Sequence, residues 1–132
     1  MVCIESKTPN RRNLFFMDYI DELKALGVNV DDALSRFMGN SALYVRMLGK
    51  LPKAVNDAPV MVCFEENRLD DAVANAHTLK GVMGNLSVTP LYEGYTKIVN
   101  DLRAGQPEPA KAELERILPI QKQIIDCIKK NS

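Results

Sequence analysis

His77 is the residue best suited to chemistry in this chain, and it is the only histidine among 132 residues. A neutral imidazole has a free lone pair at neutral pH, so it can attack phosphorus without a separate base. No carboxylate stands three or four positions to either side, so no neighbouring acid pairs with the ring as in a catalytic triad. The chemistry that this histidine suits is the acceptance and release of a phosphoryl group.

The residues that share a helix face with His77 are mostly small. Those three or four positions to either side and seven positions after it are Val73, Ala74, Lys80, Gly81 and Gly84. A glycine inside a helix costs about 1 kcal/mol relative to alanine, so two glycines beside the only histidine need a reason. Either they let another protein surface approach the imidazole, or they admit a neighbouring helix. We expect Val73, Ala74 and Gly84 to contribute to a docking surface for a partner.

Lys80 is the cation nearest to His77 along the chain, one helical turn away. Its ammonium group can reach an anion held on the ring, an attraction of about 1 kcal/mol in water and about 4 kcal/mol near a protein surface. The alternative is an ordinary solvated lysine on a helix.

The helix that carries His77 has an apolar stripe with spacings of three and four residues. Its members are Leu69, Ala72, Ala76, Leu79, Met83 and Leu86. On a helical wheel His77 lies roughly 130° from the centre of this stripe, and Gly81 lies on the far side from it. We therefore expect the ring to face solvent or a partner, and we expect no packing reason for Gly81. Asn67 is the predicted N-cap of this helix, and Pro90 is expected to open the next one.

Apolar spacing and turn residues predict the other helices. In the first half of the chain they are Leu14 to Leu26 with a stop at Gly27, Val30 to about Met38 with a cap at Asn29, a helix through Tyr44 and Val55 bent at Pro52, and Val60 to Phe64. After the helix of His77 comes Leu91 to Leu102 with a stop at Gly105. A loop is expected at Gln106–Pro109, followed by a last helix that reaches about Lys130 with a bend at Pro119. This pattern predicts an all-α fold, an antiparallel four-helix bundle with additional short N-terminal helices. We expect one domain over residues 1–132, with the bundle core at about 40–130.

Composition argues against several classes of protein. Seventeen basic residues balance seventeen acidic ones, whereas a nucleic-acid binder normally needs a basic stripe. The longest unbroken apolar run, Val60 to Phe64, is too short to span a membrane. Cys3, Cys63 and Cys127 are widely separated, which favours ordinary thiols in a reducing cytoplasm. One histidine and three scattered cysteines do not readily make a four-ligand metal site, so no metal is expected.

Two segments carry a resemblance to a known family. The run Ala76–Leu86 (AHTLKGVMGNL) strongly resembles the signature of histidine phosphotransfer (HPt) domains, and Gly27–Asn40 (GVNVDDALSRFMGN) resembles the lead-in of that family. The resemblance extends from about Leu26 to the C-terminus. It implies a mostly helical domain built on a four-helix bundle.

The resemblance also implies roles for three residues. His77 would accept a phosphoryl group from the aspartyl phosphate of a receiver domain and pass it to another receiver, Lys80 would steady that group, and Gly81 would leave room around the ring. The chain would then be a stoichiometric carrier rather than an enzyme. It would need no cofactor of its own, since the magnesium belongs to the receiver.

The partners implied are response-regulator receiver domains and a hybrid sensor histidine kinase, with no nucleic acid and no membrane. We expect a monomer. Two positions depart from the family: Ser87 stands where glycine is frequent, and Met83 where a small residue is common. We expect neither to touch the transfer face. The alternative function is an HPt-like module that docks receivers or other proteins without carrying phosphate, and the retained His77, Lys80 and Gly81 speak against it.

Overall fold

Every regular element in the computed structural model is a helix. The structure describes residues 11–131, and no strand occurs in that range. The helices are α2 (Arg11–Ala25), α3 (Val30–Arg36), α4 (Ser41–Leu48), α5 (Leu51–Asp57), α6 (Met61–Glu65), α7 (Leu69–Asn85), α8 (Thr89–Arg103) and α9 (Pro107–Lys130). The predicted all-α class is confirmed.

Capping residues fix several helix ends where the sequence predicts them. The Asn29 side chain accepts a hydrogen bond from the Asp32 N–H at 3.1 Å, at the start of α3. At the start of α4, in the break Gly39–Ser41 whose residues are also capping candidates, the Asn40 side chain accepts a hydrogen bond from the Leu43 N–H at 3.0 Å. Gly27 and Gly105 follow α2 and α8 with φ of +94° and +73°, the left-handed conformation that ends a helix.

Two helix boundaries near prolines differ from the predicted ones. The helix expected to bend at Pro52 is two helices, because Gly49 and Lys50 separate α4 from α5 and Pro52 lies in the first turn of α5. The loop expected at Gln106–Pro109 is also wrong, since α9 begins at Pro107. Proline is favourable in a first turn, where its missing N–H has no helical partner to lose. Inside α9, Pro119 does not interrupt the helix.

The predicted N-cap at Asn67 is wrong as well. Asn67 adopts a φ of +56° and belongs to the turn that closes α6, where the Arg68 N–H donates to the Cys63 carbonyl at 2.7 Å. Arg68 is the N-cap of α7 and provides no side-chain cap. Its guanidinium instead donates to Asp71 in the first turn of the helix at 2.6 Å.

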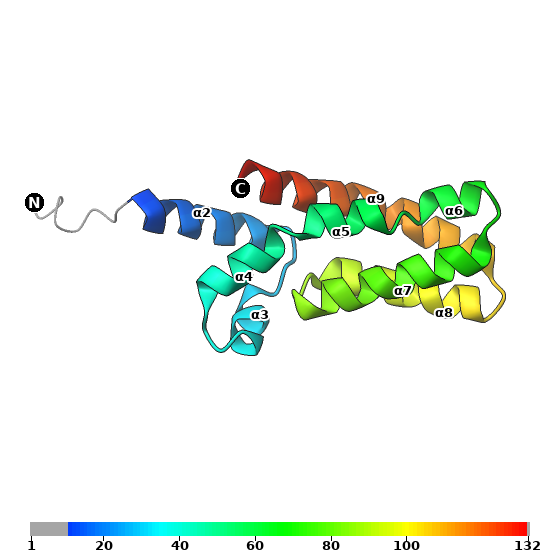
Figure 1. Ribbon diagram of the computed structural model, residues 1–132, viewed down its shortest axis with the longest axis horizontal. Helices are drawn as coiled ribbons and strands as arrows, with labels where there is room; N and C mark the ends of the chain where they lie inside the picture. The colour runs from blue at the N-terminus through cyan, green and yellow to red at the C-terminus, as the bar shows by residue number, and fades with distance from the viewer. Residues whose placement is uncertain (1–10, 132) are drawn as a thin grey trace, which may run out of the picture.

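The long helices lie alongside one another (Figure 1). α8 follows α7 and precedes α9 in the chain, and it packs against both of them. α5 and α6 also contact both α7 and α9. α2 packs against α9, where the Lys130 ammonium group pairs with Glu22 at 2.7 Å. α3 and α4 lie at the end of α7 that leads into α8. No helix among the described residues has both the length and the apolar character needed to cross a bilayer.

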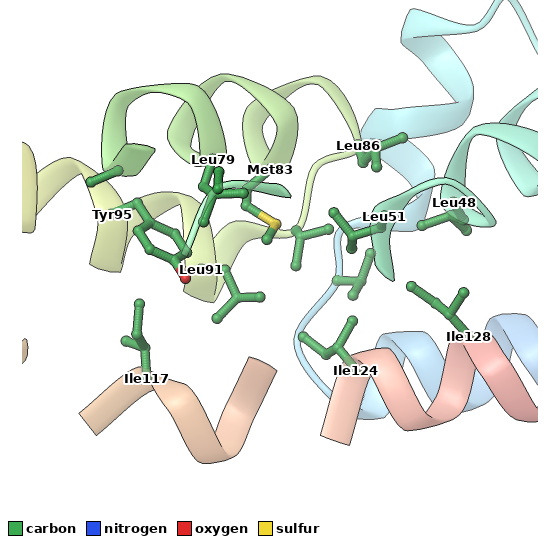
Figure 2. Close-up of a cluster of buried hydrophobic side chains, with 14 of the residues drawn as sticks. Leu48, Leu51, Leu79, Met83, Leu86, Leu91, Tyr95, Ile117, Ile124 and Ile128 are labelled. Atoms are coloured by element: carbon green, nitrogen blue, oxygen red, sulfur yellow. The ribbon is translucent and has the colours of Figure 1, made fainter. Parts of the chain in front are cut away.

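The core lies between these helices, and Figure 2 shows part of it, with side chains from α4, α5, α7, α8 and α9 directed toward one another. The fully buried large side chains include Leu48, Leu51, Leu79, Met83, Leu91, Tyr95, Ile117 and Ile124. Burying one large apolar side chain contributes about 1.5–3 kcal/mol. The stripe predicted for α7 faces this core, since Ala72, Ala76, Leu79 and Met83 are buried. The stripe therefore fixes which face of α7 is left outside.

Gly94 sets the approach of α8 to α9. A Cβ at this position would lie 2.6 and 2.9 Å from two side-chain carbons of Ile117, which is fully buried. We expect Gly94→Ala to lower the free energy of unfolding by about 1–3 kcal/mol in urea denaturation, because a close-packed core does not accept an extra methyl group. The control is Gly81→Ala, since a Cβ at Gly81 meets no atom within 4 Å. Equal stability of Gly94→Ala and the parent protein would contradict this packing.

Candidate functional site

His77 lies in the middle of α7, on the side away from the core, and its side chain is exposed. The predicted outward orientation is confirmed. In the part of the chain that the structure describes, no residue makes a side-chain hydrogen bond or ion pair with the ring. The imidazole is therefore accessible to a partner and is not engaged by the protein itself.

Small side chains leave the imidazole ring of His77 accessible on one side. Ala74 and Gly81 are exposed, while Val73 and Lys80 are half-buried. A Cβ at Gly81 would have no other atom within 4 Å, so helix packing does not require glycine there. This agrees with the wheel, which gave Gly81 no packing partner, and the approach of another molecule over this glycine stays a prediction.

Gly84 differs from Gly81. A Cβ at Gly84 would lie 3.0 and 3.1 Å from two ring carbons of Tyr92 on α8. An added Cβ would require the partly exposed Tyr92 ring to shift by a few tenths of an ångström, which favours the alternative that this glycine admits a neighbouring helix. The docking role predicted for Gly84 stays a prediction.

A hollow of about 350 Å³ begins beside Lys80 and Gly81. We call it the α7 hollow, and its lining comes from α3, the second half of α7, the turn after it and the start of α8: Asp32, Arg36, Lys80, Gly81, Gly84, Asn85, Ser87, Thr89 and Tyr92. Sequence analysis missed Asp32, Arg36, Asn85, Thr89 and Tyr92. The first two lie more than forty positions from Lys80, and no local spacing connects them with it.

Ser87 connects the turn after α7 to the start of α3 through two hydrogen bonds. Its φ of +56° is a left-handed conformation that favours glycine. The Ser87 hydroxyl donates to Asp32 Oδ2 at 2.7 Å, and its carbonyl accepts from the Asn29 N–H at 2.9 Å. Ser87 lines the same hollow as Lys80 but lies ten positions after His77 in the chain, so the expectation that it does not touch the transfer face stays a prediction. Met83 lies in the core as expected.

Tyr44 holds α4 on the same end of α7. Its hydroxyl donates to the Leu86 carbonyl at 3.0 Å, and its ring lies 5.5 Å from that of Phe37 between centroids. Burial raises the pKa of Tyr44 well above its usual value, so the phenol stays protonated and keeps donating. The short N-terminal helices are thereby fixed beside the α7 hollow.

Asp32 makes the stability depend on pH. The hydrogen bond from Ser87, and then the one from Arg36, lower the pKa of this carboxyl. A carboxyl whose pKa is lower in the folded state than in the unfolded state stabilises the fold at pH values above its unfolded-state pKa. This stabilisation is lost as the pH falls through the folded-state pKa. We expect the unfolding free energy of the parent protein to decrease more steeply below about pH 4 than that of Asp32→Asn. Urea denaturation across a pH series measures both slopes, and equal slopes would contradict the role of Asp32.

The cysteines offer no comparable chemistry. Cys63 and Cys127 are buried free thiols, and Cys3 lies outside the described residues. Burial raises the pKa of Cys127 to about 11, so its thiol is protonated at neutral pH. Among the described residues, no three or more histidine, cysteine or acidic side chains gather where they could hold a metal ion.

No protein-family model, curated protein or solved structure matches this chain. Its function is therefore inferred from its own residues and their geometry.

Proposed function

We propose that this protein is a phosphoryl carrier that uses a histidine, rather than an enzyme that turns over a substrate. More specifically, it acts as a histidine phosphotransfer domain, an intermediate between two receiver domains. The observation that carries the proposal is the exposed His77 ring, with no partner among the described residues, on a face kept low by Ala74 and Gly81. Lys80, one turn away, supplies a positive charge without an ion pair of its own in the described structure.

The proposed step is an in-line displacement at phosphorus. The imidazole lone pair forms an N–P bond while the P–O bond to the receiver's aspartate breaks, and the carboxylate leaves with the electron pair. Transfer to the next receiver reverses these roles. Such a reaction depends mainly on positioning and on electrostatic stabilisation, so an accessible ring and one cation are sufficient on this side. The magnesium ion would be held by the receiver.

The arrangement of helices supports the same class. We propose that α7, α8 and α9 form an antiparallel four-helix bundle with the α5–α6 segment as its fourth member, since α8 contacts both α7 and α9 and the α5–α6 segment contacts the same two helices. Residues 1–132 would form one domain with α2, α3 and α4 at one end. The carrier would work as a monomer in the cytoplasm, downstream of a hybrid sensor histidine kinase.

A transfer assay with receiver domains tests the proposal. Receivers from the source organism are phosphorylated with acetyl phosphate, isolated and mixed with this protein. We expect a label that survives base and is lost in acid, as a phosphorus–nitrogen bond requires. Stable binding of receivers without any transfer of label would instead support the alternative, a docking module that carries no phosphate.

Lys80→Ala tests the role of the cation. We expect the transfer rate to fall by about tenfold, equal to about 1.4 kcal/mol of transition-state stabilisation, because the phosphoryl oxygens lose a nearby positive charge. The melting temperature should change little, since no ion pair of Lys80 is lost in the described structure. Lys111→Ala on α9, a helix lysine that is exposed and lies outside the α7 hollow, is the control. Transfer at the parental rate would remove Lys80 from the mechanism.

A further inference from the structure

Arg36 is held over the α7 hollow by a single carboxylate oxygen. Its Nε donates to Asp32 Oδ2 at 3.0 Å, and the Ser87 hydroxyl donates to the same oxygen at 2.7 Å. Ser87 is nearly buried, whereas the Arg36 side chain is 57% exposed. The carboxylate therefore connects the guanidinium to the turn after α7, and the two terminal nitrogens of Arg36 have no hydrogen-bond partner among the described residues.

The α7 hollow carries a net positive charge. Arg36 and Lys80 are its cations, and Asp32 is its only acidic group. That carboxylate is already engaged by Arg36 and Ser87, while Asn85, Thr89 and Tyr92 are neutral. A guanidinium whose terminal nitrogens are free can bind a planar anion through two parallel hydrogen bonds. The hollow is thus suited to an anionic group.

The position of the hollow decides where this anion comes from. Lys80 and Gly81 lie one turn from His77, but Gly84 and Ser87 lie two turns or more away, at about 10 Å or beyond along the helix axis. A phosphoryl group attached to the ring stays near Lys80 and does not reach the far end. An anion bound at the Arg36 end would therefore come from a partner rather than from a phosphoryl group on His77.

We propose that the α7 hollow binds a carboxylate side chain of the docking receiver, with Arg36 as the residue that positions it. This inference rests on the proposed function and deepens it. Because Arg36 lies away from the reacting atoms, it acts on the assembly of the complex. The receiver concentration needed for half-maximal transfer should therefore depend on Arg36, and the maximal rate should not.

Single-turnover transfer at increasing concentrations of phosphorylated receiver tests this. We expect Arg36→Gln to raise the half-saturating concentration about tenfold and to leave the maximal rate within about twofold. The half-saturating concentration of Arg36→Lys should lie between those of the parent protein and Arg36→Gln, because lysine keeps the charge but loses the planar pair of donors. Arg103→Gln at the opposite end of α8 is the control, as an exposed arginine outside the hollow. Raising the salt concentration should weaken the parent protein more than Arg36→Gln.

Labelling by phosphoramidate separates this inference from the proposed function. This small donor transfers its phosphoryl group to an imidazole with loss of ammonia and needs no docking, so Arg36→Gln should be labelled like the parent protein. An unchanged half-saturating concentration in Arg36→Gln, or a fall in maximal rate alone, would overturn the inference and leave the carrier function standing. A parent protein that takes no label from either donor would overturn both.

Discussion

His77→Gln is expected to abolish phosphoryl uptake completely and to leave the fold intact. Glutamine is polar and of similar length, but its amide nitrogen has no lone pair available for attack on phosphorus. The ring is exposed and makes no side-chain hydrogen bond in the described structure, so the change in unfolding free energy should stay within about 0.5 kcal/mol. Labelling by phosphorylated receivers measures the first effect and urea denaturation the second.

Two outcomes of this substitution have different meanings. A His77→Gln protein that takes up as much label as the parent would place the acceptor on another residue and overturn the site assignment. A protein that loses both label and stability would mean that His77 supports the fold, contrary to its exposure. Only loss of label with retained stability agrees with a surface acceptor.

Gly81→Leu is expected to reduce transfer from receivers by at least about a hundredfold, equal to about 2.7 kcal/mol. The leucine side chain would lie one turn from His77 and beside the α7 hollow, where a Cβ would meet no side chain or neighbouring helix of the described residues within 4 Å. Any obstruction would therefore act on the partner. Leucine also favours helix more than glycine does, so the protein should gain up to about 1 kcal/mol in unfolding free energy.

Gly81→Ala and phosphoramidate provide the controls for this prediction. Alanine gives most of the gain in helix propensity with little bulk, so it should transfer faster than leucine at similar stability. Phosphoramidate needs no docking surface and should label Gly81→Leu far better than receivers do. Undiminished transfer from receivers to Gly81→Leu would show that they do not approach over this glycine.

The sequence predicts those parts of the fold that depend on nearby residues. The caps at Asn29 and Asn40 each act over three residues, and the stripe of α7 repeats every three or four. The outward position of His77 follows from that stripe alone. Proline is harder to interpret, because it is unfavourable inside a helix and favourable in its first turn. At Pro52 the second case applies, since Gly49 and Lys50 end the preceding helix.

The α7 hollow could not be predicted, because distant segments build it. Asp32 and Ser87 are separated by 55 positions, and their hydrogen bond depends on a left-handed serine that local patterns do not indicate. The difference between Gly81 and Gly84 has the same origin. Only the placement of the Tyr92 ring on α8 shows that one glycine has a packing partner and the other has none.

The return of the phosphoryl group is the most direct test of the central claim. The protein is labelled by one receiver, separated from it and mixed with a second, unphosphorylated receiver, while phosphorus NMR follows the group. The account predicts one phosphoryl group per chain on the ring of His77, followed by its appearance on the second receiver. A protein that binds both receivers but never carries the group, or carries it on another residue, would contradict the account.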